Sequence, residues 1–431
     1  MECLTPLVLA ALQGDPTHAE LLHPPPTFDG HVQRFAEGKA IYGTSLAHHL
    51  ESENFTVQWN GEDATEEYAA QVLASLEMGW QALIVEGAWP APVSSDAYLL
   101  WVILDPTIGG SGYTTVYTSD AYPEGYPVSW LSPEYGEENW PGFSLSVAVH
   151  EFSHMVQFAS RDWRSGGEES WYWEASAEWM AEQGVPDIDT YALSTYWYAT
   201  NTDAAVDSTE DSHQYGMLLL PAYLAEFVGP DVVRDSWSEN DGLDWPDAIG
   251  NAAGIPFADI VPEMAGAYAA GALSESALFY TPDPYAAAQG EDDESGLLGT
   301  LYVQVSLGDE QSFEVTGPVT VRYARDGDWS DRASETCVAA LTRTGDGTIT
   351  WDKVSAGEES GGTDSADSAG ETGEGTKAAC GCGAGAGGPA AAGFGAGAGA
   401  PAAAGFWIAC LAVGAARRPE AGGRRPEGRQ R

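Results

Sequence analysis

The sequence predicts an α+β protein in which a larger mixed domain, residues 27–290, precedes a small β-sandwich, residues 296–354. Between residues 65 and 285, apolar residues recur at helical spacing in several segments, and short apolar runs of strand length lie among them. From about residue 296, apolar and polar residues alternate with a period of two, which is typical of strands. Beyond residue 355 the chain is low in complexity and adds to neither core.

One helix and three strands are expected in the first half of the larger domain. Thr65 is a helix-capping residue followed by acidic residues, and apolar side chains then recur at helical spacing as far as Leu83. Three apolar runs of strand length come next: Tyr98–Leu104, Tyr113–Tyr117 and Pro127–Leu131. We expect the last of them to form the sheet edge.

The following segment predicts a deeply buried helix that carries an unusual set of polar residues. Pro141 is expected to open this helix, at a position that proline tolerates, and the residues after it are apolar nearly all round. Within the helix, residues 150–154 read His-Glu-Phe-Ser-His. Burying two histidines and a carboxylate is costly unless they are paired or bind a metal, so this segment is the first candidate for chemistry.

Further helices are expected after the buried helix, and then the strands of the sandwich. The predicted helices cover residues 171–183, 191–198, 223–228 and most of 231–285. The predicted strands are Thr300–Val305, Ser312–Val315, Val319–Tyr323, Cys337–Leu341 and Gly347–Trp351.

The composition is strongly acidic, with 17 basic against 65 acidic residues and a formal charge of −48. Such a surface repels nucleic acid and anionic lipid, so neither is expected as a partner of the folded body. The 16 Trp, 19 Tyr and 12 Phe residues argue against disorder for most of the chain. Four of the five cysteines lie in the terminal segments, so no disulfide framework is predicted.

Both ends of the chain carry patterns typical of export and anchoring. We interpret residues 1–26 as a degraded or truncated export signal, because the run Leu4–Leu12 is apolar although no Lys or Arg precedes it. Residues 355–377 form an acidic Gly/Ser linker. Residues 378–416 carry no charge and precede an Arg-rich tail, residues 417–431, which favours a membrane segment over the alternative of a disordered Ala/Gly tail.

Residues 150–154 have the spacing of a metal-binding pair on a helix. His150 and His154 project from one face and can hold one metal ion, and Glu151 beside them can take a proton from a bound water. Glu174, twenty residues after His154 on the next predicted helix, is available as a third ligand. Two histidines and a carboxylate leave the fourth position of a tetrahedral Zn²⁺ open for water, as in catalytic sites.

A second glutamate, Glu178, lies one turn after Glu174 on the same face of its helix. We expect Glu174 to bind the metal and Glu178 to accept the free ring N–H of a ligand histidine, which fixes the tautomer of that histidine. The alternative is that both are solvated helix glutamates, but the neighbouring Trp171, Trp173 and Trp179 favour burial.

The segments at 150–154 and at 171–179, Trp-Tyr-Trp-Glu-Ala-Ser-Ala-Glu-Trp, resemble the gluzincin metallopeptidases. This resemblance implies a zincin-like metallopeptidase domain that binds Zn²⁺. The implied roles are metal ligands for His150, His154 and Glu174, general base for Glu151 and supporting carboxylate for Glu178. Over roughly residues 45–240 the chain also resembles myxobacterial proteins taken to be surface metalloproteases, and the segment from Cys380 onward resembles the myxobacterial C-terminal sorting signal.

Gluzincins stabilise the tetrahedral oxyanion with a downstream His or Tyr, so the resemblance makes His213 and Tyr215 candidates for that role. Tyr215 is favoured because it begins an apolar helix that could pack on the buried helix. The alternative is a loop histidine and a core aromatic. The chain lacks the Gly-x-Met-Glu-Asn type of motif found in aminopeptidases, which leaves exopeptidase action in question.

The expected function is zinc-dependent hydrolysis of peptide bonds by an endopeptidase at the cell surface or outer membrane, or outside the cell. A peptide or protein is the expected substrate, and the strand Pro127–Leu131 is the expected edge that would bind it in extended form by main-chain pairing. The C-terminal segment is the expected membrane anchor. Two alternatives are a catalytically silent surface binding or adhesion protein on a zincin scaffold, and a structural metal site. The presence of Glu151 argues against the first, and the open fourth position argues against the second.

Overall fold

The computed structural model describes residues between 46 and 355, with short gaps, and all of them belong to one compact unit, Met1–Gly381. The described ranges are 46–117, 125–138, 140–161, 170–238, 243–281, 284, 289–307, 311–333 and 336–355. Four predicted segments lie outside these ranges: the leader (1–26), the linker (355–377) apart from Ser355, the membrane segment (378–416) and the Arg-rich tail (417–431).

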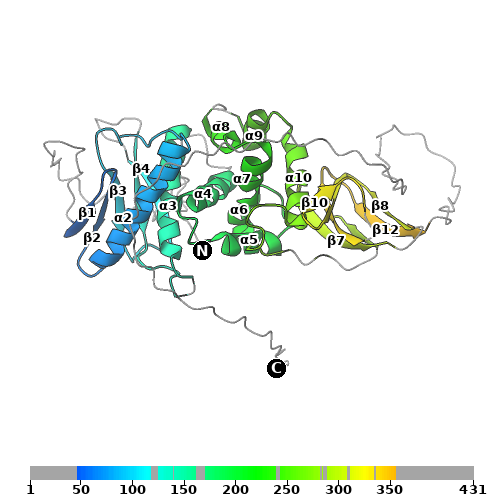
Figure 1. Cartoon of the computed structure of the whole chain (residues 1–431), viewed down its shortest axis with the longest axis horizontal. Helices are drawn as coiled ribbons and strands as arrows, with labels where there is room; N and C mark the ends of the chain where they lie inside the picture. The colour runs from blue at the N-terminus through cyan, green and yellow to red at the C-terminus, as the bar shows by residue number, and fades with distance from the viewer. Residues whose placement is uncertain are drawn as a thin grey trace, which may run out of the picture. The chain divides into compact units, whose positions relative to one another are not determined.

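The fold is α+β, as predicted, and its N-terminal part is built on a mixed five-stranded sheet (Figure 1). The strand order is β1-β2-β3-β5-β4, in which β2, β3 and β5 are parallel and the two outer strands are antiparallel to their neighbours. Every residue of the three parallel strands is buried, as expected for strands covered on both faces. The strands are β1 His48–Glu51, β2 Phe55–Trp59, β3 Leu100–Leu104, β4 Gly112–Tyr117 and β5 Tyr126–Leu131.

The prediction that Pro127–Leu131 forms the sheet edge is wrong. β5 pairs with β3 on one side and with β4 on the other, so the strand ladder already uses both of its sides. Among the described strands, β4 is the outermost on this side of the sheet. An apolar run indicates that a strand is buried, whereas its place in the sheet depends on β4 and β5 folding back on each other as an antiparallel pair.

Two helices, α2 (Glu66–Trp80) and α3 (Phe143–Ser160), pack against each other and against the sheet (Figure 1). The predicted cap of α2 is confirmed, since the Thr65 hydroxyl oxygen accepts the backbone N–H of Tyr68 at 3.1 Å. On its apolar face, Val72 and Leu76 are fully buried.

The expectation that Pro141 opens α3 is wrong, because the helix starts two residues later, at Phe143. Gly142, which precedes the helix, has a φ of 86°, and this left-handed conformation does not continue a right-handed helix. The cap is instead the carboxylate of Glu137, which accepts the backbone N–H of Gly142 at 2.8 Å and of Ser144 at 2.9 Å. An acid at this end also favours the helix electrostatically.

The helices after α3 lie close to their predicted positions, and α4 packs against α2, α3, α6 and α7. These helices are α4 Ser170–Gly184, α5 Tyr191–Thr200, α6 His213–Gly216, α7 Leu219–Tyr223, α8 Val232–Ser238, α9 Trp245–Ala253 and α10 Phe257–Ala270. Shorter helical turns are η2 Gln81–Glu86, η4 Glu210–Ser212 and η5 Leu224–Val228. α4 is buried along almost its whole length, although it contains three glutamates.

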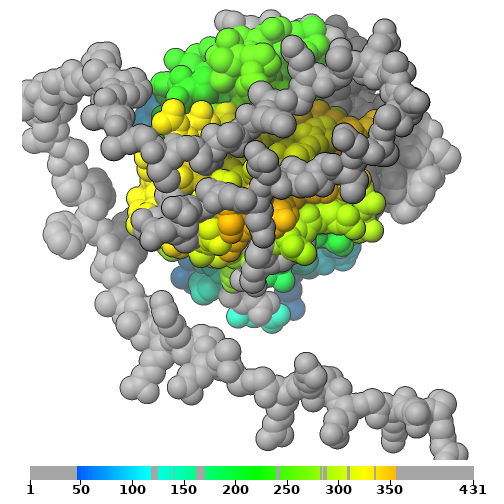
Figure 2. Space-filling view, turned by 90° about the vertical axis from the view of Figure 1, so that its right-hand side faces the viewer, coloured from blue at the N-terminus to red at the C-terminus, as the bar shows by residue number. Residues whose placement is uncertain are grey.

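Residues from 290 onward form two small antiparallel sheets, β10-β9-β11-β7 and β6-β12-β8, whose surface runs from yellow-green to orange in Figure 2. The strands are β6 Gly290–Asp292, β7 Thr300–Ser306, β8 Gln311–Thr316, β9 Val319–Arg325, β10 Asp328–Ser330, β11 Thr336–Arg343 and β12 Ile349–Ser355. One hydrophobic cluster joins the two sheets and includes Val303, Phe313 and Ile349. On α10, Glu263 pairs with Arg322 of β9 at 2.6 Å.

Within the described ranges, no single helix has both the length and the apolar character needed to cross a membrane. The bent pair Glu210–Val228 and Val232–Ser238 reaches the required length and composition only when its two parts are taken together.

Candidate metal centre

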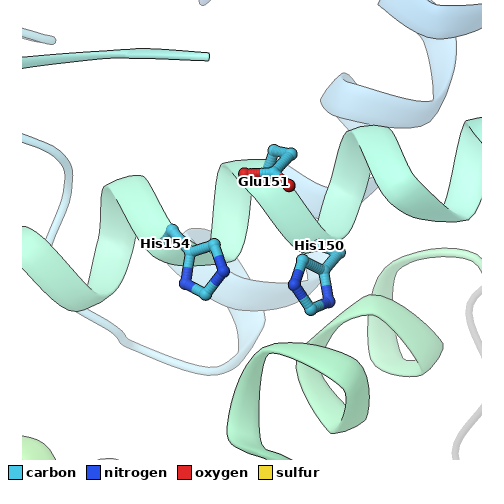
Figure 3. Close-up of side chains that lie close together, drawn as sticks. All are labelled: His150, Glu151 and His154. Carbon is cyan, nitrogen blue, oxygen red and sulfur yellow. The ribbon is translucent and has the colours of Figure 1, made fainter. Parts of the chain in front are cut away.

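α3 holds His150 and His154 one turn apart, with both side chains on the same side of the helix, and Glu151 occupies the neighbouring position around it (Figure 3). The two imidazole centroids are 4.8 Å apart. One ligand atom from each of the three residues lies within 4.8 Å of the other two. All three side chains are buried, so this group could hold a metal ion away from bulk water.

The packing of α4 on α3 places the carboxylate of Glu174 against both histidines. Its Oε2 lies 3.1 Å from Nε2 of His150, and its Oε1 lies 3.6 Å from Nε2 of His154. Burial disfavours the charged form of Glu174, but the positive charge and the N–H donors of the two histidines, when their rings are protonated, outweigh this effect and lower its pKa to about 2. Glu174 is therefore a buried anion that faces one nitrogen of each ring.

Gln157, one turn after Ser153 on α3, determines which nitrogen of His154 carries the proton. The Nε2 amide group of Gln157 donates to the backbone carbonyl of Trp173 at 3.0 Å, and a carbonyl can only accept. The Oε1 atom of Gln157 must then be the atom that lies 2.7 Å from Nδ1 of His154. That nitrogen is consequently the donor, which leaves the lone pair of Nε2 directed at Glu174.

Glu178 stands in the same relation to the other histidine. Its Oε1 is 3.4 Å from Nδ1 of His150, and its Oε2 accepts the hydroxyl of Ser194 at 3.1 Å. A carboxylate next to Nδ1 favours the tautomer that carries its proton there, so Nε2 of His150 also presents a lone pair. At this distance the contact is electrostatic, and the negative charge of Glu178 favours a proton on Nδ1.

The donor set fits a cation. With both Nδ1 atoms protonated, two nitrogen lone pairs and one carboxylate meet where His150 is 4 % exposed and His154 and Glu174 are 0 % exposed. Such a group is unfavourable unless a proton or a metal ion lies among its members. Two imidazoles and one carboxylate form the ligand set of catalytic zinc sites, although imidazole also binds copper, iron and nickel.

Glu151 points from α3 toward β4. The hydroxyl of Thr114 on β4 lies 2.8 Å from Oε2 of Glu151 and 2.9 Å from its main-chain oxygen. Gly112, at the start of β4, makes this approach possible, because a Cβ there would lie 2.9 Å from Cγ and from Oε1 of Glu151. Burial raises the pKa of Glu151, and the neighbouring His154 and His150 partly oppose the rise.

The two candidates for oxyanion stabilisation lie in different surroundings on α6. The ring of Tyr215 is 6.3 Å from the ring of His150, and both residues line a small cavity together with Ser111 and Glu178. The ring of His213 instead stacks on Tyr198, at 5.8 Å. Burial lowers the pKa of His213 to about 4, so that histidine is neutral at pH 7.

Three residues of this centre were missed as participants by sequence reasoning: Thr114, Gln157 and Ser194. Gln157 had a detectable signal, because a glutamine is out of place on a helix that is apolar nearly all round. Thr114 and Ser194 had none, since a threonine in a strand and a serine in a helix are ordinary. Their contacts with Glu151 and Glu178 exist only because β4 and α5 pack where they do.

Comparison with known proteins adds a family but no activity. The family model described as "Family of unknown function (DUF6055)" matches residues 30–249, about half of the chain. The matched range includes the sheet, α3, α4 and Tyr215. Comparison with curated proteins found no match. The chain belongs to the DUF6055 family.

Proposed function

We propose that this protein is a zinc-dependent peptidase of the gluzincin type. The observation that carries the proposal is the meeting of Nε2 of His150, Nε2 of His154 and the carboxylate of Glu174, at 3.1 and 3.6 Å, with Glu151 on the adjoining face of α3. Three protein ligands and a further carboxylate beside them, that of Glu151, are the parts that metal-assisted hydrolysis requires.

His150, His154 and Glu174 would hold the zinc ion, which would polarise the scissile carbonyl and acidify a water. Glu151 takes a proton from the attacking water and then delivers it to the leaving amine. The hydroxyl of Thr114 keeps the carboxylate of Glu151 in one orientation at 2.8 Å, so the base is positioned before the substrate arrives.

Tyr215 is the residue we assign to the oxyanion, because its ring lies beside His150 and lines the same cavity. The strand that would bind the substrate is β4 rather than Pro127–Leu131, the edge strand expected from the sequence. It is the outermost described strand next to Glu151, and an extended peptide could pair with it.

Export to the cell surface, the outer membrane or the extracellular space is part of the proposal, as is anchoring through residues 378–416. Both are supported by the sequence patterns at the two ends of the chain.

The test uses the purified full-length protein, its metal content by mass spectrometry, and cleavage of casein and of a peptide library. We expect one Zn²⁺ per chain, and a Glu151→Gln variant that keeps the zinc but loses at least about 100-fold in kcat/KM. Glu67→Gln, an exposed change on α2, is the matched control and should leave both unchanged. Stoichiometric zinc without any cleavage would instead favour the silent binding protein, and absence of zinc would refute the peptidase and the structural metal site.

A further inference from the structure

We propose that Glu182, Asp189 and Glu275 form a second cation site, selective for a hard divalent ion such as Ca²⁺ and distinct from the centre on α3. One carboxylate oxygen from each residue lies within 4.8 Å of the other two. The inference is independent of peptidase activity.

The three carboxylates come from separate segments of the fold. Glu182 is in the last turn of α4, Asp189 is in the loop before α5, and Glu275 follows the end of α10. A fourth carboxylate is close by, since Glu226 accepts the backbone N–H of Ser274 at 3.1 Å. Segments 93 residues apart in sequence thus bring negative charges together, which is unfavourable without a counter-charge.

Glu182 supplies the observation that points to a ligand. Its side chain is 4 % exposed, its Oε1 accepts the hydroxyl of Thr190, and its Oε2 is buried with no hydrogen-bond partner among the described residues. Asp189 likewise has a buried Oδ1 that no residue in the described part of the chain contacts by a hydrogen bond. Asp189 also adopts a φ of 61°, a left-handed conformation that is uncommon for residues other than glycine. Buried carboxylate oxygens that lack a donor are rare in stable proteins.

Positive side chains do not explain the cluster. In the described part of the chain, none of the ion pairs formed by Lys, Arg or His involves Glu182, Asp189 or Glu275. Burial, together with neighbours that include Glu178 and Asp189, raises the pKa of Glu182 to about 7. The pKa values of Asp189 and Glu275 are raised as well, mainly by burial. A proton can relieve the repulsion in acid, and near pH 7 a divalent cation takes that role.

The available ligands are all oxygens, which select Ca²⁺ over softer ions that prefer nitrogen or sulfur. Such an ion would tie the end of α4 to the loop before α5 and to the segment after α10. Because α4 also carries Glu174 and Glu178, the ion would hold the helix that completes the first centre. A site with three carboxylates and part of its surface exposed should bind Ca²⁺ with a Kd of about 10⁻⁵–10⁻³ M.

The experiment titrates Ca²⁺ into metal-free full-length protein by calorimetry and follows Tm in parallel. We expect one Ca²⁺ per chain and a rise in Tm of about 5 °C at 100 times Kd. Glu182→Gln should weaken binding at least 10-fold and reduce the rise to about half or less, while its Tm without Ca²⁺ stays at or above that of the wild type because an unpaired buried charge is gone. Asp187→Asn, an exposed change in the same loop, is the matched control and should behave like the wild type.

Glu275→Gln provides a second variant that disturbs no buried group, and it should also weaken Ca²⁺ binding. The proposal is overturned if the wild type binds no Ca²⁺ below 10 mM (about tenfold above the weakest expected Kd), or if Glu182→Gln and Glu275→Gln both bind as the wild type does. Neither outcome depends on zinc content or on peptide cleavage, so failure here is distinguishable from failure of the proposed peptidase.

Discussion

Replacing Gln157 by Leu should weaken zinc binding although Gln157 is not a metal ligand. The side chain is fully buried and makes three hydrogen bonds: to Nδ1 of His154 at 2.7 Å, to the carbonyl of Trp173 at 3.0 Å and to the hydroxyl oxygen of Ser176 at 3.0 Å. Leucine has similar volume, so the main change is the loss of these polar contacts.

The magnitude follows from the group left behind. His154 would keep a buried N–H without an acceptor, which costs about 1–3 kcal/mol, or would move its proton to Nε2 and lose the lone pair that faces Glu174. In the first case the metal-bound protein still contains the N–H without an acceptor. In the second case the proton must leave Nε2 before this nitrogen can bind the metal. Losing such a supporting contact typically reduces metal affinity 10–100-fold, or about 1.4–2.8 kcal/mol. The lost bonds between α3 and α4 should also lower the free energy of unfolding of the metal-free protein by about 2 kcal/mol.

Zinc affinity is measured by competition with a chromophoric chelator, and unfolding by urea titration of the metal-free protein. Gln183→Leu is the control, because Gln183 is exposed on α4 and its amide makes only a 3.4 Å contact with the carbonyl of Trp179. A zinc Kd for Gln157→Leu within twofold of the wild type would refute the reasoning about the tautomer of His154.

Three further predictions concern β4, α6 and the end of α4. Gly112→Ala places a Cβ 2.9 Å from Glu151, so we expect urea titration to show a loss of about 1–3 kcal/mol and peptide cleavage to fall with zinc content unchanged. Tyr215→Phe should lower kcat about 10-fold or more with little change in KM, whereas His213→Gln should keep kcat within about threefold; the reverse order would assign the oxyanion role to His213. Without divalent cations, Glu182 contributes stability that is fully present below pH 4.5 and is lost as pH rises through about 7, a change of about 3 kcal/mol. Urea titrations should therefore show that Glu182→Gln gains stability over the wild type at pH 7.5 but not at pH 4.5, and an equal difference at both pH values would contradict this.

Residue patterns along the chain predicted most elements but not how they meet. The period of apolar residues predicted α2, α4 and five of the seven strands of the two small sheets close to their observed bounds, but not the short strands β6 and β10. The start of α3 was misplaced, because it depends on the left-handed conformation of Gly142 and on capping by the side chain of Glu137. Helix propensity predicts neither of them. The edge strand was misplaced because burial and position in a sheet are separate properties.

For the metal centre, helix geometry alone places His150 and His154 on one face, and the apolar residues around them indicate burial. Which groups approach that face was decided by packing. The contact of α3 with α4 brings Glu174 to within 3.1 Å of His150 and lets Gln157 bridge the two helices. The period of apolar residues depends only on residues within a few positions of one another along the chain. These contacts instead join residues up to 24 positions apart and depend on how whole helices pack. The carboxylates of Glu182 and Glu275 meet for the same reason, at a separation that no spacing rule covers.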